Sequence, residues 1–72
     1  MKVGDLVMFT SEGNYAKWFF GRFAIAESVS QSPSSGEWHC RVRWLEPVKY
    51  FDRYSTVSDF ACSKFEVIDE NR

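Results

Sequence analysis

The sequence predicts one small all-β domain, a five-stranded antiparallel barrel. Apolar and polar residues alternate along several short runs, which is the period of a half-buried strand and not of a helix. Clusters of Gly, Pro, Asn and Ser separate these runs, as turns do. The 72 residues, 44% of them hydrophobic and 18% aromatic, provide for a single core. We expect the barrel over residues 1–68 and a solvated tail over residues 69–72.

The first two strands follow from local patterns. "DLVMF", residues 5–9, is a short apolar run after a Gly-Asp turn and predicts the first strand. Residues 10–20 begin with turn-forming residues and end in aromatic ones, so we expect a long loop. "GRFAIAESV", residues 21–29, alternates, with an exception at Glu27 that allows a bulge. The polar stretch 30–36 then predicts a hairpin turn.

The run "EWHCRVRWL", residues 37–45, has the cleanest alternation and predicts the central strand. Successive side chains of a strand project to opposite faces. We therefore expect one core face, formed by Trp38, Cys40, Val42 and Trp44. The other face carries His39, Arg41, Arg43 and Leu45. Parity and position place four phenylalanines in the core as well: Phe9, Phe23, Phe60 and Phe65.

The last third of the chain predicts two further strands. Residues 46–55 include Pro47 and mix charged with aromatic residues, so we expect a loop. Residues 56–60 form the expected fourth strand, and Ser58 or Asp59 caps one helical turn within residues 58–63. Residues 64–68, "KFEVI", give the fifth strand, with Phe65 and Val67 on one face.

Four segments carry a resemblance to a known fold: "VGDLVMF", "GRFAIAESV", "WHCRVRWL" and "SDFACSKFEVI". Together they resemble SH3-like barrels of the Tudor and KOW kind. They are also similar to small single-domain SH3-like proteins of bacteriophages and bacteria, many of them uncharacterised. The resemblance implies five strands, a helical turn before the last strand, and ligands that meet the connecting loops. The chain lacks the family's signature for Pro-rich ligands, because "LVMFT" stands where an "ALYDY"-like run is typical.

The residue pattern argues against an enzyme. His39 and Cys40 are neighbours on a strand, so they point to opposite faces and cannot form a catalytic dyad. The two cysteines and one histidine lack the paired spacing of a zinc site. The four glycines are scattered and form no phosphate loop. We therefore expect no catalytic residues, no metal and no cofactor.

The expected location is cytoplasmic. The sequence has no run of about 18 apolar residues and no N-terminal segment with the features of a secretory signal. In a reducing compartment Cys40 and Cys62 are expected to be free thiols.

The surplus of aromatic residues is the strongest functional indication. Thirteen rings exceed what a core of this size needs, so some should be exposed. The loop aromatics form our candidate site for a protein partner or a second copy of the chain: Tyr15, Trp18, Phe20, Tyr50, Phe51 and Tyr54. An alternative of equal weight is that these rings close the ends of the barrel by ordinary hydrophobic packing. Such a module could be an accessory protein of a bacteriophage.

The alternative function is nucleic-acid binding through the outward face of the central strand. The candidate residues are His39, Arg41, Arg43, Lys49 and Arg53. Unpaired bases could stack on aromatic residues near such a row. The net charge of −1 and cross-strand pairing of the arginines with Glu27 and Glu66 favour a neutralised surface instead.

Overall fold

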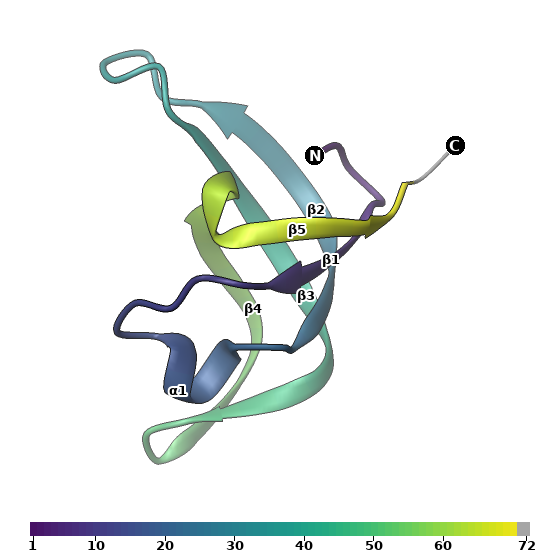
Figure 1. Cartoon of the computed structure of the whole chain (residues 1–72), viewed down its shortest axis with the longest axis vertical. Helices are drawn as coiled ribbons and strands as arrows, with labels where there is room; N and C mark the ends of the chain where they lie inside the picture. The colour runs from purple at the N-terminus through teal and green to yellow at the C-terminus, as the bar shows by residue number, and fades with distance from the viewer. Residues whose placement is uncertain (71–72) are drawn as a thin grey trace.

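A computed structural model describes residues 1–70 of the chain. It contains five strands, a four-residue helix and a 3-10 turn (Figure 1): β1 (Leu6–Phe9), α1 (Ala16–Phe19), β2 (Phe23–Gln31), β3 (Trp38–Tyr50), β4 (Arg53–Ala61), η1 (Cys62–Lys64) and β5 (Phe65–Asp69). The strands form one antiparallel sheet in the order β4-β3-β2-β1-β5. The radius of gyration is 11.7 Å, and about 11 Å is expected of a compact chain of this length. The domain is therefore mostly β and compact.

The sheet is strongly bent. In Figure 1 β1 and β5 cross in front of β3 and β4, so the two ends of the sheet face each other. Rings from both ends meet there: Phe9 of β1 lies 5.0 Å from Phe60 of β4 between ring centroids, and 5.4 Å from Phe65 of β5. Within residues 1–70 no strand pairing joins β4 to β5. Side chains, and not backbone hydrogen bonds, fill this seam.

The core face of β3 is confirmed over most of its length. Cys40, Val42, Trp44 and Val48 are all buried, whereas Arg41 and Arg43 between them are exposed. Phe9 and Phe65 are also in the core, and Phe60 is half-buried against it. Cys40, Val42 and Trp44 thus form an apolar stripe along the inside of the bent sheet, and Val48 joins the core beyond the exposed Glu46.

Two residues predicted to lie in the core are exposed. Phe23 is 42% exposed because β2 turns Ala24 and Ala26 to the core and thereby Phe23 to the outside. The register of β2 against β3 shifts between Ala26 and Ser28, and this bulge changes the parity of the strand. Trp38 is 52% exposed, because it is the first residue of β3 and lies beyond the buried layer that begins at Cys40.

The predicted loop over residues 46–55 is wrong. β3 continues to Tyr50, and β4 begins at Arg53 after a turn at residues 51–52. The β3–β4 pairing jumps from Arg43↔Val57 to Val48↔Ser55. Pro47 lies in this jump, where the ladder needs no N–H from it. The resulting hairpin carries β3 and β4 past α1 to one end of the molecule (Figure 1).

Other elements agree with the sequence pattern. A helical turn before the last strand is present as η1, and the bulge of β2 is present at Glu27. The predicted caps are wrong, because β4 continues through Ser58 and Asp59 and Ala61 is the residue before the turn. The first loop contains a short helix, α1, that the sequence did not predict. β5 extends to Asp69, one residue into the predicted tail, and residues 71–72 of that tail lie outside the described residues.

A candidate aromatic interface

Four of the predicted site residues meet on one surface. Tyr15 and Trp18 come from the β1–β2 connection, and Tyr50 and Phe51 come from the β3–β4 hairpin. The centroids of Trp18 and Tyr50 lie 4.7 Å apart, those of Trp18 and Phe51 4.9 Å, and those of Tyr50 and Phe51 4.5 Å. Tyr15 stacks on Tyr50 at 6.1 Å. We call these four rings the aromatic platform.

The platform is accessible to solvent. Phe51 is 64% exposed and Tyr15 is 42% exposed, while Trp18 and Tyr50 are half-buried. Phe51 takes a left-handed backbone conformation, with φ of 57°, at the tip of the hairpin. Residues other than glycine rarely adopt this backbone conformation. The turn therefore presents a large ring at a position that glycine would suit better.

The surroundings of Tyr50 in the platform change the pKa of its hydroxyl. Loss of solvent around Tyr50 raises the pKa of its hydroxyl, and the neighbouring Tyr15 acts in the same direction. The Tyr50 hydroxyl consequently stays neutral through the physiological range.

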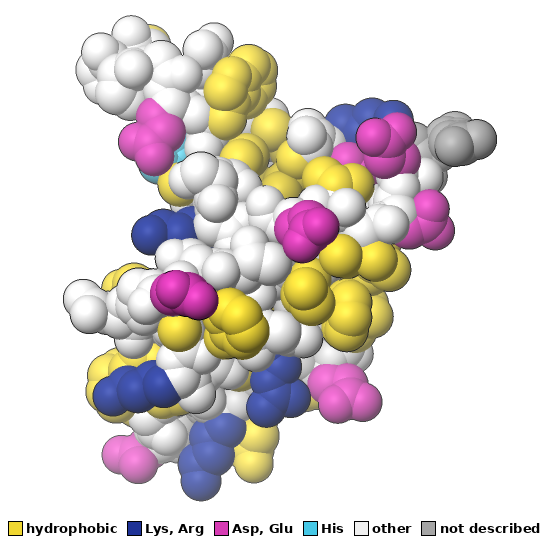
Figure 2. All heavy atoms as spheres, viewed as in Figure 1, with side chains coloured by type: hydrophobic (Ala, Val, Ile, Leu, Met, Phe, Trp, Pro, Cys, Tyr) yellow, Lys and Arg dark blue, Asp and Glu magenta, His cyan; other side chains and the backbone are white. Residues whose placement is uncertain are grey.

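Lys17 contributes a cation to this surface. Its Nζ lies 4.3 Å from the centroid of the Trp18 ring, within the range of a cation–π contact. Figure 2 shows further Lys and Arg side chains around the end of the molecule where α1 and the β3–β4 turn lie, with acidic side chains close by. The rings are thus framed by charges of both signs.

A shallow hollow of about 330 Å³ continues from the platform along β4. Tyr15, Phe19, Tyr50 and Phe60 provide its aromatic side. Ser55, Ser58 and Asp59 of β4 provide its polar side. β4 is an edge strand of the sheet, so we call this feature the β4 hollow.

The polar side of the β4 hollow is held by a chain of hydrogen bonds. The indole N–H of Trp44 donates to Ser58 Oγ at 2.9 Å, and Ser58 Oγ lies 2.9 Å from Ser55 Oγ. Ser55 Oγ in turn donates to the Val57 carbonyl at 3.1 Å. Because each hydroxyl is engaged, the serines have fixed positions and connect the surface to the buried Trp44.

Two predicted site residues lie away from the platform. Phe20 is 52% exposed and follows α1, but it makes no ring contact within residues 1–70. Tyr54 is 67% exposed and pairs with Lys49 on the outward face of the hairpin, opposite to Tyr50. Conversely, the sequence analysis did not assign Phe19 and Phe60 to the site. The signal for Phe19 was its spacing from Tyr15, which places both on one side of a helical turn.

The arginines of the alternative nucleic-acid site form ion pairs. Arg41 Nε donates to Asp59 at 2.9 Å, and Arg43 Nε donates to Glu27 at 2.7 Å. The hydrogen bond from Arg41 lowers the pKa of the Asp59 carboxyl, and the same bond raises the pKa of Arg41. Glu27 is the partner that the sequence suggested, whereas Asp59 takes the place expected for Glu66. The outward face of β3 is therefore a charge-balanced surface in this structure.

The remaining residues of the alternative site are spread along β3 and β4. His39 is exposed near the start of β3, on the same face as Arg41. Lys49 and Arg53 lie at the far end of the hairpin and are exposed. These five side chains therefore form no compact basic patch.

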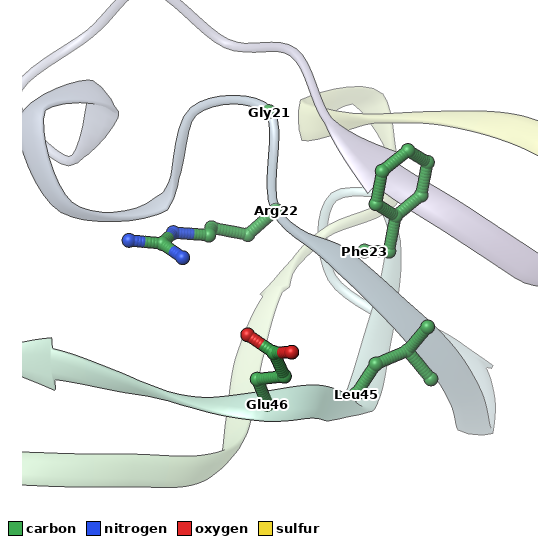
Figure 3. A pocket seen from close by; sticks show the side chains of 5 residues that line it. All are labelled: Gly21, Arg22, Phe23, Leu45 and Glu46. Carbon is green, nitrogen blue, oxygen red and sulfur yellow. The ribbon is translucent and has the colours of Figure 1, made fainter.

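A second hollow, of about 240 Å³, lies where β2 begins beside the middle of β3. Figure 3 shows Phe23 and Leu45 on one side of it and the side chains of Arg22 and Glu46 on the other. Phe23 and Leu45 are 42% and 57% exposed. This hollow has only two large apolar side chains in its lining, whereas the platform and the β4 hollow together present several aromatic rings.

Among residues 1–70 no three His, Cys, Asp or Glu side chains are grouped to hold a metal ion. Over the same range, no helix has the length and apolar character needed to cross a membrane. Comparison of the chain with protein-family models, with curated proteins and with solved structures finds no match.

Proposed function

We propose that this chain is a non-catalytic binding module that takes a segment of a protein partner on the aromatic platform and the β4 hollow. The observation that carries the proposal is the convergence of rings from residues 15–18 and 50–51 on one exposed surface. Exposed apolar clusters of this kind usually mark interaction surfaces, and Trp and Tyr are the residues most enriched among energetically dominant contacts.

We further propose that the domain is an SH3-like barrel of the Tudor or KOW kind. The sheet order β4-β3-β2-β1-β5 and the 3-10 turn before β5 support this assignment. In that class ligands meet the connecting loops. Here the first connection supplies Tyr15 and Trp18, and the β3–β4 hairpin supplies the other two rings. An accessory protein of the bacteriophage or bacterial kind, working in the cytoplasm, would fit a module of this size.

The packing of the rings indicates how a partner would be held. The rings contact one another at centroid distances of 4.5–4.9 Å, so they offer faces and edges and no empty cage between them. A partner would therefore lay apolar side chains over Trp18 and Phe51. Its polar groups would reach Ser55, Ser58 or Asp59 in the β4 hollow. Lys17, which covers one face of Trp18, would have to move aside.

Peptide selection from a random displayed library tests the proposal. Peptides enriched on the wild-type chain should bind Trp18→Ala and Phe51→Ala at least about 30-fold more weakly, as loss of a dominant contact predicts. Phe20→Ala is the matched control, because Phe20 is exposed but lies off the platform. Equal losses in all three variants, or none, would contradict the proposal.

Binding to a single-stranded oligonucleotide distinguishes the alternative function. Phosphate contacts would make the affinity fall steeply with salt, and Arg41→Glu with Arg43→Glu would abolish it. Because both arginines are paired with carboxylates, we expect no measurable binding near 150 mM salt, a concentration that already screens exposed charges over about 8 Å. If the chain bound the oligonucleotide in a salt-dependent way and the double variant did not, the result would favour nucleic-acid binding through the outward face of β3.

A further inference from the structure

The two cysteines of the chain lie together at the opposite end of β3 from the aromatic platform. Cys40 is buried in β3 and pairs with Phe60 of β4. Cys62 follows Phe60 by two residues and begins η1. In an antiparallel ladder the residue two positions along the partner strand is a diagonal neighbour on the same face. The topology therefore brings both thiols to the inner side of the sheet.

The two side chains are neighbours at this end of the sheet. Cys62 lies near enough to the Cys40 thiol to contribute to the rise in its pKa. Cys40 belongs to the buried core and Cys62 packs against that core. Because the chain leaves β4 for a 3-10 turn at Cys62, this residue is not held to the regular diagonal spacing of two strands.

The surface gives a small reagent access to one of the thiols. Cys62 is half-buried and lines an apolar hollow of about 280 Å³ together with Met1, Val29 and Trp38. Cys40 is only 3% exposed. A reagent that enters this hollow therefore meets Cys62, whereas Cys40 borders a separate hollow of about 350 Å³ on the side of His39 and Arg41.

We propose that Cys40 and Cys62 are a dithiol pair that closes to a reversible intramolecular disulfide in exchange with a low-molecular-weight disulfide such as oxidised glutathione. In the first step the Cys62 thiolate attacks one sulfur of the reagent, forms a mixed disulfide and releases one glutathione thiolate. In the second step the Cys40 thiolate attacks the Cys62 sulfur, forms the protein disulfide and releases the second glutathione. Two protein thiols are oxidised and one glutathione disulfide is reduced to two thiols.

The environment of Cys40 makes the second step the slower one. Burial, supported by the nearby Cys62, raises the pKa of the Cys40 thiol to about 12. Only the thiolate is nucleophilic, so closure should accelerate as the pH rises toward this value. Charged groups that face the pair are few: Asp59 acts in the same direction as Cys62, and the N-terminal ammonium opposes it.

Closure would fasten β3 to the turn that leads into β5. These elements lie next to the seam where no strand pairing joins β4 to β5 in residues 1–70. A covalent link at this place would restrict opening of the sheet. The inference does not depend on the aromatic platform, which lies at the other end of β3.

Intact mass after exposure to glutathione redox buffers, with remaining thiols blocked by an alkylating reagent, tests the proposal. The wild-type chain should lose two hydrogens, take up no alkyl group and stay monomeric, and a dithiol reductant should reverse the change. Cys40→Ser should instead accumulate one glutathione on Cys62, whereas Cys62→Ser should accumulate none. Peptide mapping of the wild-type product should show residues 40 and 62 joined.

The result that would overturn the proposal is a wild-type chain that gains glutathione or forms linked dimers without the loss of two hydrogens. A chain whose two thiols both remain open to alkylation in fully oxidised buffer would overturn it equally. If either serine variant fails to fold, as circular dichroism would show, the mass and peptide map of the wild-type chain still decide. A melting temperature that is higher after oxidation, and returns on reduction, is the expected second readout.

Discussion

Two tryptophans of β3 illustrate how position decides a side chain's role. Trp38 and Trp44 have the same parity on the strand. Trp44 is 4% exposed, stacks on Phe19 with centroids 4.9 Å apart and donates its indole N–H to Ser58. Trp38 is 52% exposed, at the rim of the sheet. Only Trp44 therefore contributes a large buried area to folding.

This difference gives a paired prediction for stability. Trp44→Ala should lower the free energy of unfolding by about 3–5 kcal/mol, because it leaves a cavity in the core. Trp38→Ala should change it by less than about 1 kcal/mol, as surface substitutions usually do. Urea unfolding of both variants measures the two values. A larger loss for Trp38→Ala would mean that the core face of β3 is misplaced.

Cys40 predicts a pH dependence of stability. Its pKa is raised from the usual 9.0 to about 12, chiefly by burial. The folded state therefore holds the proton more tightly than the unfolded state. This stabilisation is complete below pH 9 and is lost as the pH rises from about 9 to about 12. Unfolding of wild type and Cys40→Ala across that range should show a smaller decline in the variant; parallel curves would contradict the assignment.

At the scale of elements, the connection that carries α1 depends on one glycine. Gly21 has φ of 77° and closes the turn between α1 and β2, where its N–H bonds to the Phe9 carbonyl at 2.9 Å. Gly21→Ala should lower the free energy of unfolding by about 1–2 kcal/mol, because an L side chain disfavours this conformation.

Gly13 provides the control for Gly21. Its φ is not positive, and an added Cβ would meet Ser11 Oγ at 3.6 Å, an ordinary contact. Thermal unfolding of Gly13→Ala should thus match that of the wild-type chain within about 0.5 kcal/mol. If Gly21→Ala were equally harmless, the turn that positions Trp18 would not require the left-handed conformation.

The sequence was most informative for elements with uninterrupted alternation. The core face of β3 from Cys40 to Trp44 and the turn before β5 follow directly from the pattern. The face of β2 did not, because the bulge at Glu27 changes the parity and small alanines, not Phe23, pack inside. The extension of β3 was hidden by Pro47, which a strand tolerates only where its ladder is interrupted.

The candidate site shows the same limit. Composition predicts that some loop rings are exposed, since thirteen exceed the needs of the core. Which rings meet depends on the hairpin at residues 51–52, and the sequence analysis assigned that region to a loop. Hence Tyr15, Trp18, Tyr50 and Phe51 of the predicted set lie together, while Phe20 and Tyr54 make no ring contact with them.

At the scale of the whole molecule, surface area limits self-association. A stable interface buries about 800 Å² per partner. The chain exposes 4989 Å² in total, so a stable dimer would need roughly a sixth of it. Four rings that are already packed together offer less than this. We expect a monomer at micromolar concentration, by light scattering at low and at high salt. A dimer that persists at high salt and is lost in Phe51→Ala would show that the platform binds a second copy.

The three tryptophans report on three separate parts of the molecule. Trp18 lies on the platform, Trp38 lines the hollow beside Cys62, and Trp44 is in the core. Each indole N–H gives a separate signal in a ¹H–¹⁵N spectrum. We would follow the three signals while a selected peptide is added. The account predicts that the Trp18 signal shifts progressively while those of Trp38 and Trp44 stay in place. A shift of Trp38 with Trp18 unmoved would place the binding surface at the other end of the molecule and contradict it.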